Sequence, residues 1–129
     1  MTYDIVRPAG LEWITRPHDP GEPARHTAEL SELAGFEHAR ANFWRYEPGA
    51  KGRRHRHPVQ EEVFVVLDGT LSMYLGEPPE RVDVPAGGIV RVAPGTPLQT
   101  VNHADEDLLV YAHGWPPEAG RAELLDSAV

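Results

Sequence analysis

The sequence predicts an all-β protein, built as an antiparallel sandwich or a closed barrel. Short segments of apolar or alternating side chains follow one another from residue 39 onward, and each ends at a glycine or proline turn. No long helical period interrupts them. The chain of 129 residues suits one domain with its own core. Closure of the sheet, or a second sheet, would protect the edges of such short strands.

The N-terminal region is expected to form an irregular arm packed on the domain. Residues 1–25 hold four prolines among charged side chains, with a short strand expected at residues 11–15. Leucines three apart, followed by Gly35, predict one or two helical turns over residues 27–34. The expected division of the chain is an arm, one barrel and a tail, at residues 1–40, 41–113 and 114–129.

The strands of the barrel are predicted from period-2 alternation and from β-branched or aromatic side chains. They are expected at residues 39–47, 62–67, 70–75, 81–84, 89–92, 98–102 and 108–111. The Asp68-Gly69 pair predicts a hairpin before the strand at residues 70–75. After Pro116-Pro117, residues 118–126 are expected to form a short helix in the tail.

The run VFVVL at residues 63–67 is apolar on both faces of its strand. Such a strand needs cover on both faces, so one face is expected to look into the barrel and the other onto a second sheet or a partner chain. A homodimer follows as the expected assembly.

Composition excludes several classes of partner. The formal net charge of −8 disfavours nucleic acid and anionic membranes. No apolar run is long enough for a membrane helix and residues 1–10 lack the form of a signal peptide, so a cytoplasmic protein is expected. Only residues 51–57, KGRRHRH, are basic; they are interpreted as a solvated loop whose arginines can meet an anionic substrate near a metal.

One stretch, residues 49–69, carries the candidate chemistry: His55, His57 and a carboxylate, Glu61 or Glu62. Cysteine is absent, so a metal would depend on His, Asp or Glu. His55 and His57 share a face of a strand, and Pro58 favours a bend over residues 58–60 after which a second strand returns the carboxylate. Imidazole nitrogens with a carboxylate oxygen suit a divalent first-row metal.

The spacing of this stretch resembles the first motif of the cupin family, small β-barrels of the jelly-roll or double-stranded β-helix type. That motif is a glycine, five residues, His-x-His, three or four residues, a glutamate, six residues and a glycine. The matching residues are Gly49, His55, His57, Glu62 and Gly69. The resemblance therefore implies that Glu62, and not Glu61, is the ligand.

The second cupin motif is matched only in part. Gly87, Gly95 and Asn102 fit it, but Ala93 stands in place of a proline and Leu98 in place of a histidine. In the family that histidine completes a site of three histidines and one glutamate, so this chain lacks the fourth protein ligand.

The resemblance implies a metal-dependent enzyme acting on a small organic molecule, by oxidation, isomerisation or decarboxylation. His55, His57 and Glu62 would hold Zn, Fe, Mn, Ni or Cu and leave coordination positions open for water, substrate or dioxygen. His113 shares the parity of Leu109 and Tyr111 and is a further candidate ligand if that face points inward. The alternative is a non-catalytic module that binds or senses a small ligand, either with a metal or without one, since Leu98 replaces the usual fourth ligand. No separate catalytic residue or cofactor fingerprint is found.

Overall fold

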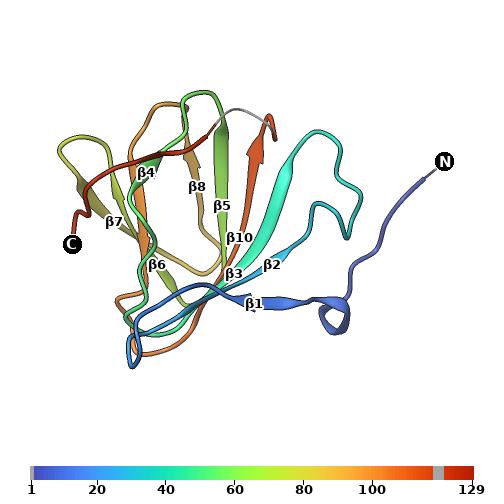
Figure 1. Cartoon of the computed structure of the whole chain (residues 1–129), viewed down its shortest axis with the longest axis horizontal. Coiled ribbons are helices and arrows are strands. Elements are labelled where there is room, and N and C mark those ends of the chain that lie inside the picture. The colour runs from blue at the N-terminus through green and yellow to red at the C-terminus, as the bar shows by residue number, and fades with distance from the viewer. Residues whose placement is uncertain (1, 118–120) are drawn as a thin grey trace.

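The computed structural model describes residues 2–117 and 121–129, and consists of two antiparallel sheets packed face to face (Figure 1). In spatial order, the larger sheet contains β1 (Trp13–Thr15), β2 (Arg25–Glu29), β3 (Arg40–Tyr46), β10 (Leu108–Trp115), β5 (Glu61–Asp68) and β8 (Ile89–Val92). The smaller sheet contains β11 (Glu123–Leu124), β4 (His55–Arg56), β9 (Leu98–Val101), β6 (Thr70–Leu75) and β7 (Glu80–Pro85). The predicted all-β sandwich is confirmed.

Helical structure is confined to one 3-10 turn, Pro8–Gly10, within the described part of the chain. None of the described helices is long and apolar enough to cross a membrane.

The core lies between the inner faces of the two sheets. In β10 the residues at even positions are buried and their neighbours are half-buried or exposed, as alternation in a strand requires. In the run at residues 63–67, Phe64 and Val66 belong to the core whereas Val63 and Val65 lie on the outer face. Leu71, Met73 and Leu98 fill the opposite side from the smaller sheet.

The Asp68-Gly69 turn does not form the predicted hairpin. β5 and β6 flank it, but β5 belongs to the larger sheet and β6 to the smaller one, so the chain changes sheets at Gly69. Gly69 has a φ of +82°, and a Cβ there would lie 2.8 Å from the carbonyl oxygen of Asp107. The prediction of a turn at this glycine is confirmed, although the turn joins two layers.

The helix predicted over residues 27–34 is wrong. Residues 25–29 form β2, which pairs with β1 and β3, and turns follow it. Leu30 is buried whereas Leu33 is 49% exposed, so the two leucines do not form one apolar helical face. Pairing between distant strands outweighed a weak local preference.

The helix predicted over residues 118–126 is also not found where it can be tested. Residues 118–120 lie outside the described residues, and residues 121–126 contain the two-residue strand β11 in place of a helix. In Figure 1 the C-terminal segment (red) runs alongside β4, with which β11 pairs.

Candidate metal centre

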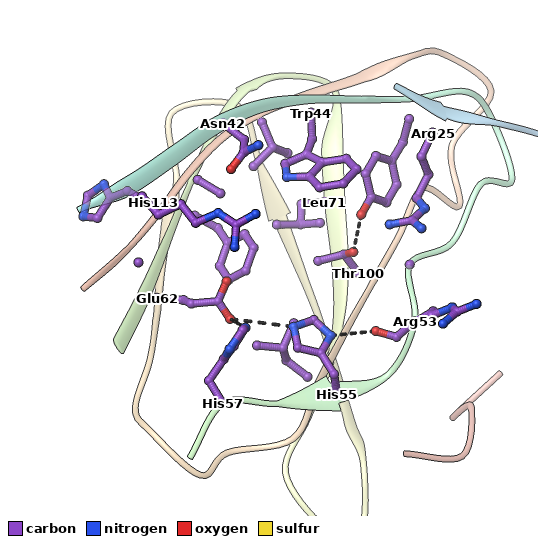
Figure 2. Close-up of a pocket in the computed structure, with 18 of the residues that line it drawn as sticks. Arg25, Asn42, Trp44, Arg53, His55, His57, Glu62, Leu71, Thr100 and His113 are labelled. Atoms are coloured by element: carbon purple, nitrogen blue, oxygen red, sulfur yellow. Dashed lines mark hydrogen bonds and ion pairs between the residues drawn. The ribbon is translucent and has the colours of Figure 1, made fainter. Parts of the chain in front are cut away.

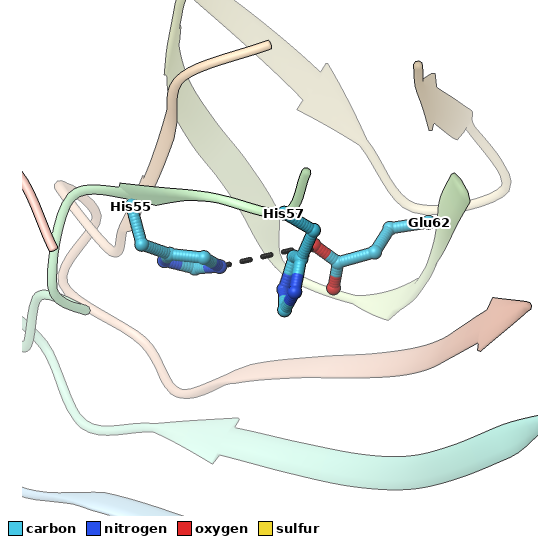
Figure 3. A group of neighbouring side chains, drawn as sticks. All are labelled: His55, His57 and Glu62. Carbon is cyan, nitrogen blue, oxygen red and sulfur yellow. Dashed lines mark ion pairs between the residues drawn. The ribbon is translucent and has the colours of Figure 1, made fainter. Parts of the chain in front are cut away.

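Three polar side chains from the predicted stretch meet at one end of the sandwich. His55 lies in β4, His57 follows β4 directly, and Glu62 is the second residue of β5. The chain bends over residues 58–59, as predicted from Pro58, and returns Glu62 toward the histidines. Figure 3 shows the three side chains converging, and one potential ligand atom from each lies within 4.8 Å of the other two.

The Glu62 carboxylate is enclosed between the two imidazoles. Its Oε1 atom lies 3.0 Å from Nε2 of His57 and 3.7 Å from Nε2 of His55. This oxygen is buried, yet it accepts no hydrogen bond of suitable geometry from the described residues. A buried carboxylate oxygen without a hydrogen bond needs a cation or a proton beside it.

His55 is held in a tautomer that suits metal binding through Nε2. Its Nδ1 atom lies 2.8 Å from the backbone carbonyl oxygen of Arg53, to which the Nδ1–H donates. In the neutral ring this leaves the lone pair on Nε2, the atom that faces Glu62. Metal-binding histidines are commonly oriented by such a hydrogen bond from the other ring nitrogen.

The protonation of the group is set by burial and by mutual proximity. Burial alone would raise the pKa of Glu62, but His55 and His57, which present Nε2–H groups and positive charge to the carboxylate when they are protonated, outweigh burial and lower the pKa to about 2. Burial also tends to lower the pKa of His55, while Glu62 and the Arg53 carbonyl raise it, and the net shift is upward. Arg25 acts on His55 in the opposite direction through its positive charge.

The three side chains form part of the wall of a cavity of about 280 Å³ between the sheets. This volume is just below the range of about 300–1,000 Å³ for small-ligand pockets. Apolar side chains, among them Leu71, Leu108 and Val110, line the interior. Trp44 and Tyr46 line it from β3, and the Tyr46 hydroxyl lies 2.6 Å from Oγ1 of Thr100 (Figure 2).

A family model for the cupin domain matches residues 42–114, more than half of the chain. The chain belongs to the cupin family. No curated protein matches the sequence.

Solved structures agree with this assignment at the level of the fold. A cupin-superfamily sugar phosphate isomerase from Silicibacter pomeroyi is 23% identical, with a TM-score of 0.74, and the match covers 86% of this chain and 74% of that one. A predicted oxalate decarboxylase from Thermotoga maritima is 18% identical, with a TM-score of 0.75 and coverages of 87% and 98%. An uncharacterized Klebsiella pneumoniae protein with a double-stranded β-helix domain is 23% identical, with a TM-score of 0.69 and coverages of 87% and 90%. The predicted double-stranded β-helix is therefore confirmed.

Leu98 lies in the wall of this cupin cavity, beside the group formed by His55, His57 and Glu62. It pairs directly with His55 across β4 and β9, and it is only 1% exposed. The position of the family's missing histidine thus faces the group and is apolar here. Thr100, two residues along the same strand, also faces the cavity, but its hydroxyl is engaged by Tyr46.

The two remaining candidates do not join this group, although His113 also lines the cavity. Glu61 points away from the histidines and pairs with Arg91 at 2.7 Å, as expected for the residue that is not the ligand. His113 is not brought into the group: it lies on the face of β10 opposite the core residue Ala112, and its ring packs against Tyr111 at 5.5 Å. Figure 2 shows the His113 ring turned away from Glu62.

Sequence reasoning missed most of the positive charge in this cavity. Of the basic stretch at residues 51–57, only Arg53 among the arginines lines the cavity, while Arg54 and Arg56 pair with Glu77 and Glu123. Arg25 enters the cavity from β2, where it pairs with Tyr46 of β3. Its role depends on strand register, for which the local sequence holds no signal.

Proposed function

We propose that this cupin is a metal-dependent enzyme that acts on a small organic molecule, with His55, His57 and Glu62 as the metal ligands. The observation that carries the proposal is the buried Glu62 Oε1 atom, which lies between two imidazole nitrogens and accepts no hydrogen bond from the residues that the structure describes. The orientation of His55 by the Arg53 carbonyl supports the same role. Two imidazoles and one carboxylate suit Zn, Fe, Mn, Ni or Cu.

When bound, such a metal supplies Lewis acidity, a more acidic bound water, or a redox centre, according to its identity. The chain's own residues contribute orientation and exclusion of water. The apolar wall formed by Leu71, Leu98 and Leu108 lowers the local polarity beside the ligands. Because Leu98 cannot coordinate a metal, a coordination position next to His55 stays open to an exogenous ligand.

The class of reaction is proposed as oxidation, isomerisation or decarboxylation. Proteins of similar fold include one described as a sugar phosphate isomerase and one described as a predicted oxalate decarboxylase. The similarity supports chemistry on small oxygen-rich molecules in this type of barrel, and the cavity of about 280 Å³ is suited to that size.

A second candidate function is a non-catalytic module that binds a small ligand. One observation favours it: Glu62 is the only carboxylate among the described residues that line the cavity, and the proposed metal would engage it. No second acid is then left in the described wall to move a proton on the substrate. Turnover separates the two candidates.

The test of the metal site is elemental analysis of protein purified without chelator and without added metal. We expect close to one first-row metal per chain in the wild type and close to none in a His55→Ala/His57→Ala variant. The matched control is His38→Ala/His103→Ala, which removes two exposed histidines and should keep the metal. Equal, near-zero metal in the wild type and the site variant contradicts the proposal.

Turnover is then measured as dioxygen uptake and product formation over a panel of small phenols, diketones, hydroxy acids and sugar phosphates. Tight binding by the metal-loaded protein without any turnover favours the non-catalytic module.

We also propose a homodimer formed through the outer face of the larger sheet. Residues that pair directly across its six strands form an apolar row: Trp13, Ala28, Phe43, Tyr111, Val65 and Ile89. Ile89 is 65% exposed at the end of this row, and a second copy would cover it in a two-fold, self-complementary contact. Light scattering after size exclusion should give a dimer for the wild type and a monomer for Ile89→Glu; a monomeric wild type contradicts this proposal.

The cytoplasmic location and the lack of nucleic-acid or membrane partners stay predictions that rest on charge and composition.

A further inference from the structure

The cavity carries positive charge that a metal site does not use. Four arginines line it: Arg16, Arg25, Arg40 and Arg53. Glu62 is the only carboxylate among the described lining residues, so the wall holds three net positive charges when its histidines are neutral. The whole chain has a formal net charge of −8. Positive charge is therefore concentrated at this cavity, against the sign of the protein.

The arginines of the cavity also differ in their pairing from four of the arginines elsewhere. Four arginines outside the cavity form ion pairs with carboxylates, namely Arg54, Arg56, Arg81 and Arg91. Among the described residues, no carboxylate lies within 4.0 Å of the four arginines of the cavity, and their side chains donate no hydrogen bond. The chain has 20 acidic residues, so this is not a shortage of carboxylates.

Arg25 is the best placed of the four to contact a ligand. Its guanidinium lies 5.3 Å from the ring centroid of Trp44 and 5.8 Å from that of Tyr46, and both rings line the cavity. Stacking on aromatic rings fixes the guanidinium and leaves the N–H donors at its edge free. Figure 2 shows this side chain directed into the cavity, beside Trp44 and above Thr100.

Arg25 and the metal group are linked through the same wall. Tyr46, on whose ring Arg25 stacks, bonds to Thr100 of β9. Thr100 is two residues from Leu98, which pairs with His55. Arg25 and the three potential metal ligands thus line the same cavity of about 280 Å³, and a ligand bound in it can contact both.

We propose that the cavity binds a small organic anion, with Arg25 as the residue that recognises its carboxylate or phosphate group. A planar guanidinium pairs bidentately with either group. The full ligand has two functional ends: an oxyanion for Arg25 and an oxygen for the metal. The second end rests on the function proposed above, whereas the anion site stands on the arginines alone. The same charge disfavours cationic ligands.

The experiment is isothermal titration of two probe anions, malonate and inorganic phosphate, into metal-free protein, with propane-1,3-diol as an uncharged probe. We expect the wild type to bind at least one anion and not the diol. Arg25→Gln should weaken the binding of that anion about 10- to 100-fold, the range for loss of charge-assisted hydrogen bonds. The matched control Arg81→Gln removes the same charge from a surface ion pair and should leave the affinity unchanged. The preferred probe separates carboxylate from phosphate recognition.

Binding of neither anion by the wild type, or equal binding by Arg25→Gln, overturns the proposal. If Arg25→Gln does not fold, as judged by circular dichroism, Arg25→Lys replaces it; this variant keeps the charge but loses the planar fork. We then expect a several-fold weaker affinity, and an unchanged affinity overturns bidentate recognition. Metal content of the protein as purified, measured before the metal is removed for the titration, keeps the two proposals apart. Arg25-dependent anion binding by a protein that holds no metal as purified rejects only the metal-dependent function, and a protein that holds metal as purified but binds neither anion rejects only the anion site.

Discussion

The two halves of the barrel that meet at the cavity differ in the side chains that they present to it. The half that contains β4 and β5 carries His55, His57 and Glu62, all polar and facing the cavity. The half that contains β8 and β9 presents Leu98 at the corresponding place, opposite His55. Yet the second half keeps Gly95, with a φ of +82°, and the buried Asn102.

The difference separates the parts of the second cupin motif that build the fold from the part that does chemistry. Asn102 donates to the carbonyl oxygens of Tyr46 and Glu106 and accepts from the backbone N–H of Ala104. These bonds tie β3 to the loop before β10 whether or not a metal is present. Leu98 cannot bind a metal, but it leaves all three hydrogen bonds of Asn102 in place.

The largest effect is expected when the structural residue of the second half is removed. Asn102→Ala would leave three backbone groups without their partner in a site that is 0% exposed. We expect the free energy of unfolding to fall by about 3 kcal/mol, near 1 kcal/mol for each lost bond, in urea denaturation. The metal content of the folded protein should not change. A stable variant that has lost its metal would show that the two halves are not separable in this way.

An effect of similar size is expected from pH in the first half. The pKa of Glu62 is lowered from 4.5 to about 2, so its contribution to stability is present above pH 4.5 and is lost as pH falls toward 2, by on the order of 3 kcal/mol. The pKa of His55 is raised above 6.5, so its contribution is present below pH 6.5 and is lost as pH rises through the raised value.

Metal-free protein should therefore gain most from this group between about pH 4.5 and 6.5. Urea denaturation in the presence of chelator, for the wild type and Glu62→Gln, isolates this gain as the difference between the two. Glu61→Gln is the matched control, since it removes the neighbouring carboxylate from the outer face. A pH-independent difference between wild type and Glu62→Gln contradicts the description of the group.

A smaller effect should follow when the missing ligand is restored. Four-ligand zinc sites bind with about 10–16 kcal/mol, or about 2.5–4 kcal/mol per ligand, so an added imidazole that is not ideally oriented is worth about 10- to 100-fold in affinity. Leu98→His places an imidazole opposite His55, and we expect zinc to bind about 10- to 100-fold more tightly in competition with a chelating dye. Leu71→His introduces histidine at another buried position of the cavity wall and serves as the control. Equal gains in both variants would mean that position 98 is not special.

The smallest effect concerns the turn of the second half. A Cβ added at Gly95 would meet no other atom within 4 Å, but the residue has a positive φ, so Gly95→Ala should cost only backbone strain, about 1 kcal/mol. Gly10, which also has open space but no positive φ, is the matched control and should change little. Thermal unfolding measures the stability of both variants. We expect Gly95→Ala to lose well more stability than Gly10→Ala, with an unchanged metal content.

Much of this architecture was predictable because its signals are local. The strands at residues 70–75 and 89–92 match β6 and β8, since alternation and flanking turns both lie within a few residues. The convergence of His55, His57 and Glu62 was predictable for the same reason, because Pro58 marks the bend between His57 and Glu62.

What could not be predicted depends on which strand meets which. Asp68-Gly69 specifies a turn but not whether the strands after it stay in one sheet. Residues 27–34 have weak helical signals that yield to pairing with β1 and β3. Arg25 reaches the cavity only because its strand is in register with Tyr46, a relation between residues 21 positions apart.

The short strand β4 has a consequence for the order of events during synthesis. It contains two residues, is paired with β9 through His55 alone, and gains its second neighbour from β11, whose Leu124 pairs with His55. About 70 residues separate these partners, which at ~5–20 residues per second corresponds to ~4–14 s of translation. Until residues 123 and 124 have emerged from the ribosome, β4, which carries His55, can pair with β9 on one side only. Loading of metal should accordingly be a late event, after the barrel itself has closed.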